Sequence, residues 1–118
     1  MDVTQYFRKS KGNSKYHAQK SNGYASRKEN RRANELKLLE RQGLIKHLRE
    51  QVRYEIIPRQ YGPDGKLLER PCYYIADFVY TDKNGNLIVE DTKGYRTEVY
   101  KIKRKLMLYT HGIRITEK

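Results

Sequence analysis

The chain has 118 residues, 34% of them charged, and a formal net charge of +12, so it has room for one domain with a modest core and favours a polyanionic partner, nucleic acid above all. Its N-terminus lacks an apolar leader and no segment approaches the ~18 consecutive apolar residues that span a bilayer, so we expect a cytoplasmic protein that does not enter a membrane. The single cysteine, Cys72, excludes an intramolecular disulfide and is consistent with a reducing compartment.

Residues 1–24 are predicted to form a flexible basic arm, followed by one domain over residues 25–118. The arm combines five lysines and arginines with small polar residues and has no apolar periodicity. Such a segment buries too little apolar surface to order itself alone. It would either contact nucleic acid or act as a solubilising tail.

The first predicted helix begins at Ser26, because serine followed three residues later by Glu29 matches the capping-box pattern. It should end near residue 41 or 42, before Gly43. Ala33 and Leu36 lie on its inward stripe, and Glu29 lies on the same stripe. The Glu29 carboxylate therefore either closes the capping box or faces a functional site.

Three strand-like segments follow, at residues 51–57, 72–80 and 86–93, and they are rich in β-branched and aromatic residues. A glycine- and proline-containing loop over residues 62–65 separates the first two segments.

Thr97 can cap a second helix that runs to about residue 109, before a short last strand at residues 113–116. Its expected inward residues are Val99, Ile102, Leu106 and either Met107 or Tyr109. The order helix, three strands, helix, strand predicts an α/β fold with a central mixed sheet flanked by helices.

Charged residues interrupt the two most apolar strands. Asp91 and Lys93 are two positions apart, so their side chains share one face of the strand, whereas Glu90 would point to the other face and lie outside the site. Asp77 interrupts the preceding strand. Charges inside a sheet are costly unless they are paired or bind a metal ion.

The turn between these strands decides whether Asp77 and Asp91 meet. A two-residue turn would place them on different faces, whereas a three-residue loop over residues 83–85, with Gly85 left-handed, places Asp77 opposite Asp91. Asp82 and Gly85 favour the three-residue loop. Opposed carboxylates destabilise a sheet unless a cation lies between them, which suggests Mg²⁺ or Mn²⁺.

Such an ion would polarise a phosphoryl oxygen and lower the pKa of a bound water. Lys93 would then either stabilise charge on the reacting phosphate or orient the attacking water. Asp77, Asp91 and Lys93 are therefore the candidate catalytic residues.

The stretch from Ile75 to Phe78, the turn, and the stretch from Val89 to Gly94 together resemble the PD-(D/E)XK nuclease superfamily, whose core has the αβββαβ order. More closely, residues 24–116 resemble a family of small phage and prophage proteins of unknown function within that superfamily. Segments 26–29 and 48–51, with Thr97, Tyr100 and Lys103, add to this resemblance. Ala76 departs from it, since the motif has proline there.

The resemblance implies a restriction-endonuclease-like fold and a DNA endonuclease. It implies that Glu29, Asp77 and Asp91 bind the metal ion, that Lys93 is catalytic, and that Gln51 is a secondary polar site residue. Branched DNA as substrate and a homodimer follow by analogy with phage resolvases of this fold.

Basic residues on both helices are candidate contacts for the DNA backbone, although they equally fit a solvated helix surface. They are Arg27, Lys28, Arg31, Lys101, Lys103 and Arg104. The composition also fits a nucleic-acid-binding module that cuts nothing, or an accessory subunit of a phage DNA-processing complex.

Overall fold

The computed structural model describes residues 26–92 and 95–118. The arm expected at residues 1–24 and the catalytic candidate Lys93 lie outside the described residues. In chain order the elements are α2 (Arg27–Arg41), β1 (Ile45–Ile57), β2 (Gln60–Tyr61), β3 (Leu67–Glu69), β4 (Cys72–Asp82), β5 (Leu87–Asp91), α3 (Glu98–His111) and β6 (Thr116–Glu117).

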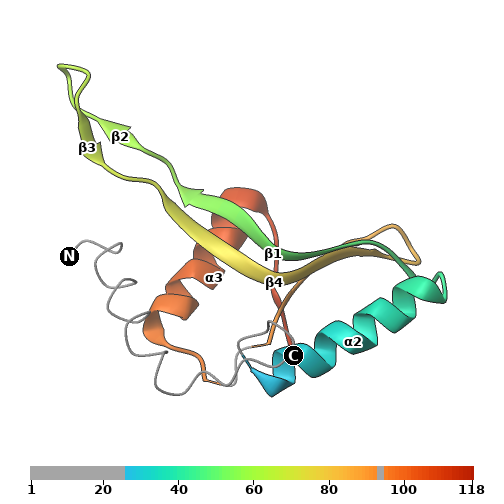
Figure 1. Ribbon diagram of the computed structural model, residues 1–118. Helices are drawn as coiled ribbons and strands as arrows, with labels where there is room; N and C mark the ends of the chain where they lie inside the picture. The colour runs from blue at the N-terminus through green and yellow to red at the C-terminus, as the bar shows by residue number, and fades with distance from the viewer. Residues whose placement is uncertain (1–25, 93–94) are drawn as a thin grey trace.

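The strands form a four-stranded sheet in the order β1-β4-β5-β6, and a separate two-stranded sheet is made by β2 and β3 (Figure 1). β4 pairs antiparallel with β1 and with β5, whereas β6 runs parallel to β5. The chain therefore has the expected α/β class and mixed central sheet.

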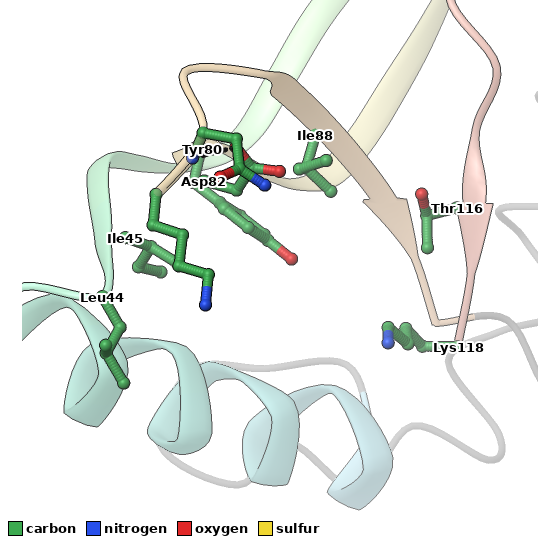
Figure 2. A pocket seen from close by; sticks show the side chains of 9 residues that line it. Leu44, Ile45, Tyr80, Asp82, Ile88, Thr116 and Lys118 are labelled. Carbon is green, nitrogen blue, oxygen red and sulfur yellow. Dashed lines mark hydrogen bonds between the residues drawn. The ribbon is translucent and has the colours of Figure 1, made fainter.

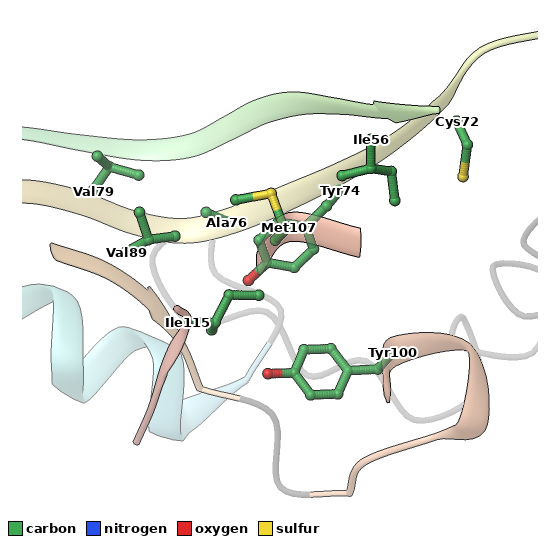
Figure 3. Packing of buried hydrophobic residues seen from close by; sticks show 9 residues of the cluster. All are labelled: Ile56, Cys72, Tyr74, Ala76, Val79, Val89, Tyr100, Met107 and Ile115. Atoms are coloured by element: carbon green, nitrogen blue, oxygen red, sulfur yellow. The ribbon is translucent and has the colours of Figure 1, made fainter. Parts of the chain in front are cut away.

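Two hydrophobic clusters cover the sheet. Helix α2 contributes Ala33 and Leu36 to the α2 cluster, which also contains Phe78 and Tyr80. Helix α3 contributes Tyr100 and Met107 to the second cluster, which we call the α3 cluster (Figure 3). Its members are Ile56, Cys72, Tyr74, Ala76, Val79, Val89, Tyr100, Met107 and Ile115. Along β4, the even-numbered residues thus change their packing partner from α3 to α2 on passing Asp77.

The ends of α2 lie where the sequence predicts them. The Ser26 hydroxyl accepts a hydrogen bond from the backbone N–H of Glu29 at 3.1 Å. After the helix, Gly43 has a φ of 77°, which favours glycine.

The turn between β4 and β5 has the three-residue loop that the sequence favours. The Gly85 N–H donates to the Asp82 carbonyl at 3.0 Å and the Asp82 N–H donates to the Asn86 carbonyl at 2.9 Å. Gly85 has a φ of 85°. Val79 lies opposite Val89, as predicted.

The predicted strand over residues 51–57 is too short, because β1 begins at Ile45. The ladder with β4 shifts register between Lys46 and Arg49, and His47 has a φ of 58°. This bulge breaks the alternation that would reveal a strand. The β2–β3 hairpin was also missed, since its strands are short and exposed.

In α3, Met107 is buried as expected, but the prediction for Ile102 was wrong. Ile102 is 52% exposed, and Tyr100 is buried in its place. The inward stripe thus passes through Tyr100, whose hydroxyl bonds to the Glu117 carboxylate at 2.7 Å. Helical periodicity alone does not reveal that a tyrosine has such a partner.

Glu90 points to the face opposite Asp91, as the strand alternation predicts, but this face is buried against α2. Its exposure is 0%, a burial that the sequence did not predict. Arg32 donates to both carboxylate oxygens, at 2.8 Å from Nε and 2.7 Å from Nη2, and the Tyr80 hydroxyl donates as well. Burial, followed by the bond to Glu90, raises the pKa of Tyr80 to about 12. The bond to Glu90 raises the pKa of Arg32.

In the part of the chain that the structure describes, neither helix has the length and apolar character needed to cross a membrane.

The Arg32–Glu90 pair yields the first prediction. Arg32→Ala leaves a buried carboxylate without its cation, so we expect the free energy of unfolding to fall by about 3–5 kcal/mol. Urea denaturation followed by circular dichroism measures the change. Arg31→Ala, at the exposed neighbouring position, should change stability by less than about 0.5 kcal/mol; equal losses in the two variants would contradict the assignment.

Candidate active site

Asp77 and Asp91 lie on the adjacent strands β4 and β5. The last pair of the ladder is Phe78 with Glu90, and Asp77 and Asp91 are the residues immediately beyond it on their two strands. The Asp77 carboxylate accepts hydrogen bonds from the backbone N–H and the hydroxyl of Thr92, both at 2.9 Å. These two donors fix the direction of the carboxylate.

The Asp91 carboxylate is held by a buried tyrosine. Asp91 is 1% exposed, and the Tyr74 hydroxyl donates to its Oδ2 at 2.8 Å. Burial raises the pKa of Tyr74, followed by the negative charge of Asp91 and, more weakly, that of Asp77. The Tyr74 hydroxyl is thus bonded to Asp91.

Gln51 lies on β1, the strand that pairs with β4 on the side away from β5. The β1–β4 ladder pairs Glu50 with Phe78 and Val52 with Ala76, which brackets Gln51 opposite Asp77. Gln51 has a φ of 54°, a left-handed conformation that is uncommon for a residue with a side chain. Its position is therefore specified by the surrounding sheet.

Helix α2 reaches this position through Glu29. The Glu29 carboxylate is buried and accepts a hydrogen bond from Gln51 Nε2 at 3.2 Å. Its backbone N–H meanwhile bonds to Ser26. The backbone of Glu29 thus takes part in the helix cap, while its side chain points to β1 and bonds to Gln51.

A further acid lies on the fourth strand of the sheet, β6. Glu117 on β6 pairs with Asp91 in the parallel ladder. Its carboxylate is bonded by the Tyr100 hydroxyl at 2.7 Å, by Arg96 at 2.9 Å and by Arg104 at 3.2 Å. We call the set Gln51, Asp77, Asp91 and Glu117 the polar row; it crosses β1, β4, β5 and β6 in spatial order.

The polar row contains three of the predicted site residues, Gln51, Asp77 and Asp91, and a fourth, Glu29, is bonded to Gln51. Lys93 is outside the described residues. Among residues 26–92 and 95–118, no group of three or more histidine, cysteine, aspartate or glutamate side chains is arranged to hold a metal ion. Two protein carboxylates are nevertheless sufficient for Mg²⁺, which keeps several of its waters.

The residues predicted to contact DNA have different surroundings on the two helices. On α2, Arg27, Lys28 and Arg31 are exposed near its N-terminus. On α3, Lys101 pairs with Glu98 at 3.2 Å, Arg104 pairs with Glu117, and Lys103 is half-buried.

Three residues of the site escaped prediction: Tyr74, Thr92 and Glu117. Tyr74 and Thr92 each donate to an acid of the row, and Glu117 extends it. The only available signal was that a polar or ionisable group in an apolar strand needs a partner, and this does not say which partner.

A hollow of about 440 Å³ lies elsewhere, at the end of the sheet where the β4–β5 turn approaches the start of β1 (Figure 2). Leu44, Ile45, Tyr80, Asp82, Lys83, Asn84, Ile88, Thr116 and Lys118 line it. Its carboxylate, Asp82, accepts bonds from the backbone N–H groups of Asn84 and Asn86 within the turn. None of the predicted catalytic residues lines this hollow.

Comparison with known proteins gives one family match. A family model described as "Protein of unknown function (DUF1064)" matches residues 9–116. No curated protein matches the chain. No solved structure matches it either.

The contacts of Glu117 predict a pH dependence of stability. The Tyr100 hydroxyl first, then Arg104 and Arg96, lower the pKa of Glu117 from its ordinary value of 4.5. A depressed pKa stabilises the fold above the unfolded-state value, and this contribution is lost as the pH falls through the folded-state value. We expect Glu117→Gln to destabilise the protein at about pH 7 and the difference from the parent to shrink below about pH 4.

Urea denaturation across this pH range measures the effect. Glu98→Gln, which removes an exposed acid that pairs with Lys101, is the matched control and should change stability little at any pH. A Glu117→Gln deficit that stays constant down to about pH 3 would contradict the linkage.

Proposed function

We propose that this chain, which belongs to the family described as "Protein of unknown function (DUF1064)", is a metal-dependent nuclease that hydrolyses phosphodiester bonds in DNA. The observation that carries the proposal is the pair Asp77 and Asp91, two acids on adjacent strands just beyond the Phe78–Glu90 pair, each oriented by its own hydrogen-bond donors. A protein that only binds DNA has no need to align two carboxylates, since aligned acids repel the phosphate backbone.

The donor set suits a hard divalent cation. Mg²⁺ or Mn²⁺ would be held by Asp77 and Asp91, with Glu29 as the third candidate ligand, and would supply Lewis-acid polarisation of a phosphate and activation of a water.

The neighbouring residues would act by positioning these acids. Thr92 fixes the direction of Asp77, Tyr74 that of Asp91, and Gln51 bonds to Glu29. Such partners orient metal ligands and are commonly worth about 10–100-fold in metal affinity. Lys93 follows Asp91 by two positions and would supply positive charge to the reacting phosphate.

The finer assignment is a restriction-endonuclease-like fold acting as an endonuclease, with branched DNA as substrate and a homodimer as the assembly. The helix–strands–helix–strand order and the mixed sheet support it, as does the likeness of the Asp77 and Asp91 segments to the PD-(D/E)XK motif. A two-site dimer would allow paired cuts in a four-way junction.

A second candidate is a nucleic-acid-binding module without catalysis, either by itself or as an accessory subunit of a DNA-processing complex. The net charge of +12 favours it. It differs from the nuclease in requiring neither the metal ion nor the acids, so one assay separates the two functions.

That assay is cleavage of linear, flapped and four-way DNA with Mg²⁺, with Mn²⁺ and with EDTA. We expect metal-dependent cutting by the parent. Asp77→Asn should lower the rate at least about 100-fold, because it removes the negative charge that holds the cation. Lys93→Ala should lower it to a similar extent, about 100-fold or more, because it removes a charge that stabilises the reacting phosphate.

Binding measured in EDTA should survive in both variants. Asp64→Asn, which changes an exposed acid in the loop between β2 and β3, is the control and should cut like the parent. Parent protein that binds every substrate yet cuts none would support the binding module. Cutting that persists undiminished in both variants would exclude the site described above.

A separate prediction concerns the Tyr74 hydroxyl. Tyr74→Phe keeps the ring that packs in the α3 cluster but removes the donor to Asp91. We expect Mn²⁺ affinity, measured by electron paramagnetic resonance without DNA, to fall about tenfold. Tyr109→Phe, at an exposed position on α3, should bind Mn²⁺ like the parent; equal affinity of all three proteins would remove Tyr74 from the site.

A further inference from the structure

A second hollow, of about 280 Å³, lies between the C-terminal half of α3 and the segment that leads into β6. Arg104, Lys105 and Leu108 line it from the helix, and Arg114, Ile115 and Glu117 line it from the other side. We call it the basic pocket. Its apolar members form part of the wall, and its polar members are three cations and one carboxylate.

The carboxylate of the basic pocket already has three donors, all on its Oε2. Glu117 accepts bonds from Tyr100, Arg96 and Arg104, and in Figure 3 Tyr100 directs its hydroxyl toward β6. Its low pKa, caused first by the Tyr100 hydroxyl and then by the two arginines, keeps it charged. Glu117 therefore neutralises part of the positive charge and also fixes where the two guanidinium groups lie.

The remaining charge is positive. Lys105 and Arg114 are exposed, and within the described parts of the chain no carboxylate lies at ion-pair distance from either. Arg104 uses Nη1 for Glu117, and a guanidinium has five N–H donors in all. A group with several acceptor oxygens and negative charge would complete the pocket, which describes a phosphate.

The basic pocket adjoins the polar row. Glu117 and Asp91 are ladder partners on neighbouring strands, and neighbouring strands lie about 4.8 Å apart. Along a DNA strand, phosphates follow one another at about 3.4 Å of helix axis. A DNA strand with one phosphate at Asp77 and Asp91 would therefore carry others within reach of the pocket.

We propose that the basic pocket binds a phosphodiester group that neighbours, along the same DNA strand, the phosphodiester that is cut. This inference rests on the proposed function. Arg104, Lys105 and Arg114 contact the phosphate, and Glu117 is a positioning residue that holds Arg104 in place. The pocket thereby sets how the strand lies across the row.

The test is DNA binding in EDTA, which is independent of cutting. Fluorescence anisotropy with a short duplex is measured over a series of KCl concentrations for the parent and for the double variant Lys105→Gln and Arg114→Gln. Both positions are exposed, so the variant should fold, which circular dichroism checks. We expect about tenfold weaker binding, and the slope of log K against log salt should become shallower by about 1, as for one lost phosphate contact.

The matched control is the double variant Arg59→Gln and Lys66→Gln. It removes the same charge from exposed positions at and near the β2–β3 hairpin and should retain the parental slope. An unchanged slope in the pocket variant, or the same loss in both variants, would overturn the proposal. A pocket variant with the expected slope change would support it even if the parent cuts no DNA, so its failure is distinguishable from failure of the proposed nuclease.

Discussion

The buried ion pair between Glu90 and Arg32 is the interaction on which the rest of the structure depends. A carboxylate with 0% exposure is tolerated only because a guanidinium bonds both its oxygens and Tyr80 adds a further donor. The pair attaches α2 to β5. Since successive side chains of a strand point to opposite faces, it also directs Asp91 away from α2 and toward Tyr74.

The chain has eleven tyrosines and no tryptophan, and three of these tyrosines combine a packed ring with a hydroxyl that bonds to an acid. Tyr74, Tyr80 and Tyr100 each pack a ring in a hydrophobic cluster. Their hydroxyls bond respectively to Asp91, Glu90 and Glu117. A small core thus accommodates acids on β5 and β6, because the same side chain supplies both apolar surface and a donor.

The polar row lies where the sheet passes from one hydrophobic cluster to the other. Tyr74 and Ala76 pack in the α3 cluster, whereas Phe78 and Tyr80 pack in the α2 cluster. Asp77 lies between these pairs, opposite Gln51 with its left-handed backbone. Polar side chains gather at this boundary, and Glu29 from α2 joins them through its bond with Gln51.

The sequence by itself determined the local features: the Ser26 cap, the Asp82–Gly85 turn, and through that turn the register of β4 on β5. These rest on contacts between residues close in the chain, whose geometry recurs in many proteins. It also selected Asp77, Asp91, Glu29 and Gln51 as candidates. Only the tertiary structure decided that Glu90 is buried, that β1 begins at Ile45 across a bulge, and that Glu117 joins the row. Each of these depends on a partner far along the chain, such as Arg32 for Glu90, and no local pattern specifies that partner.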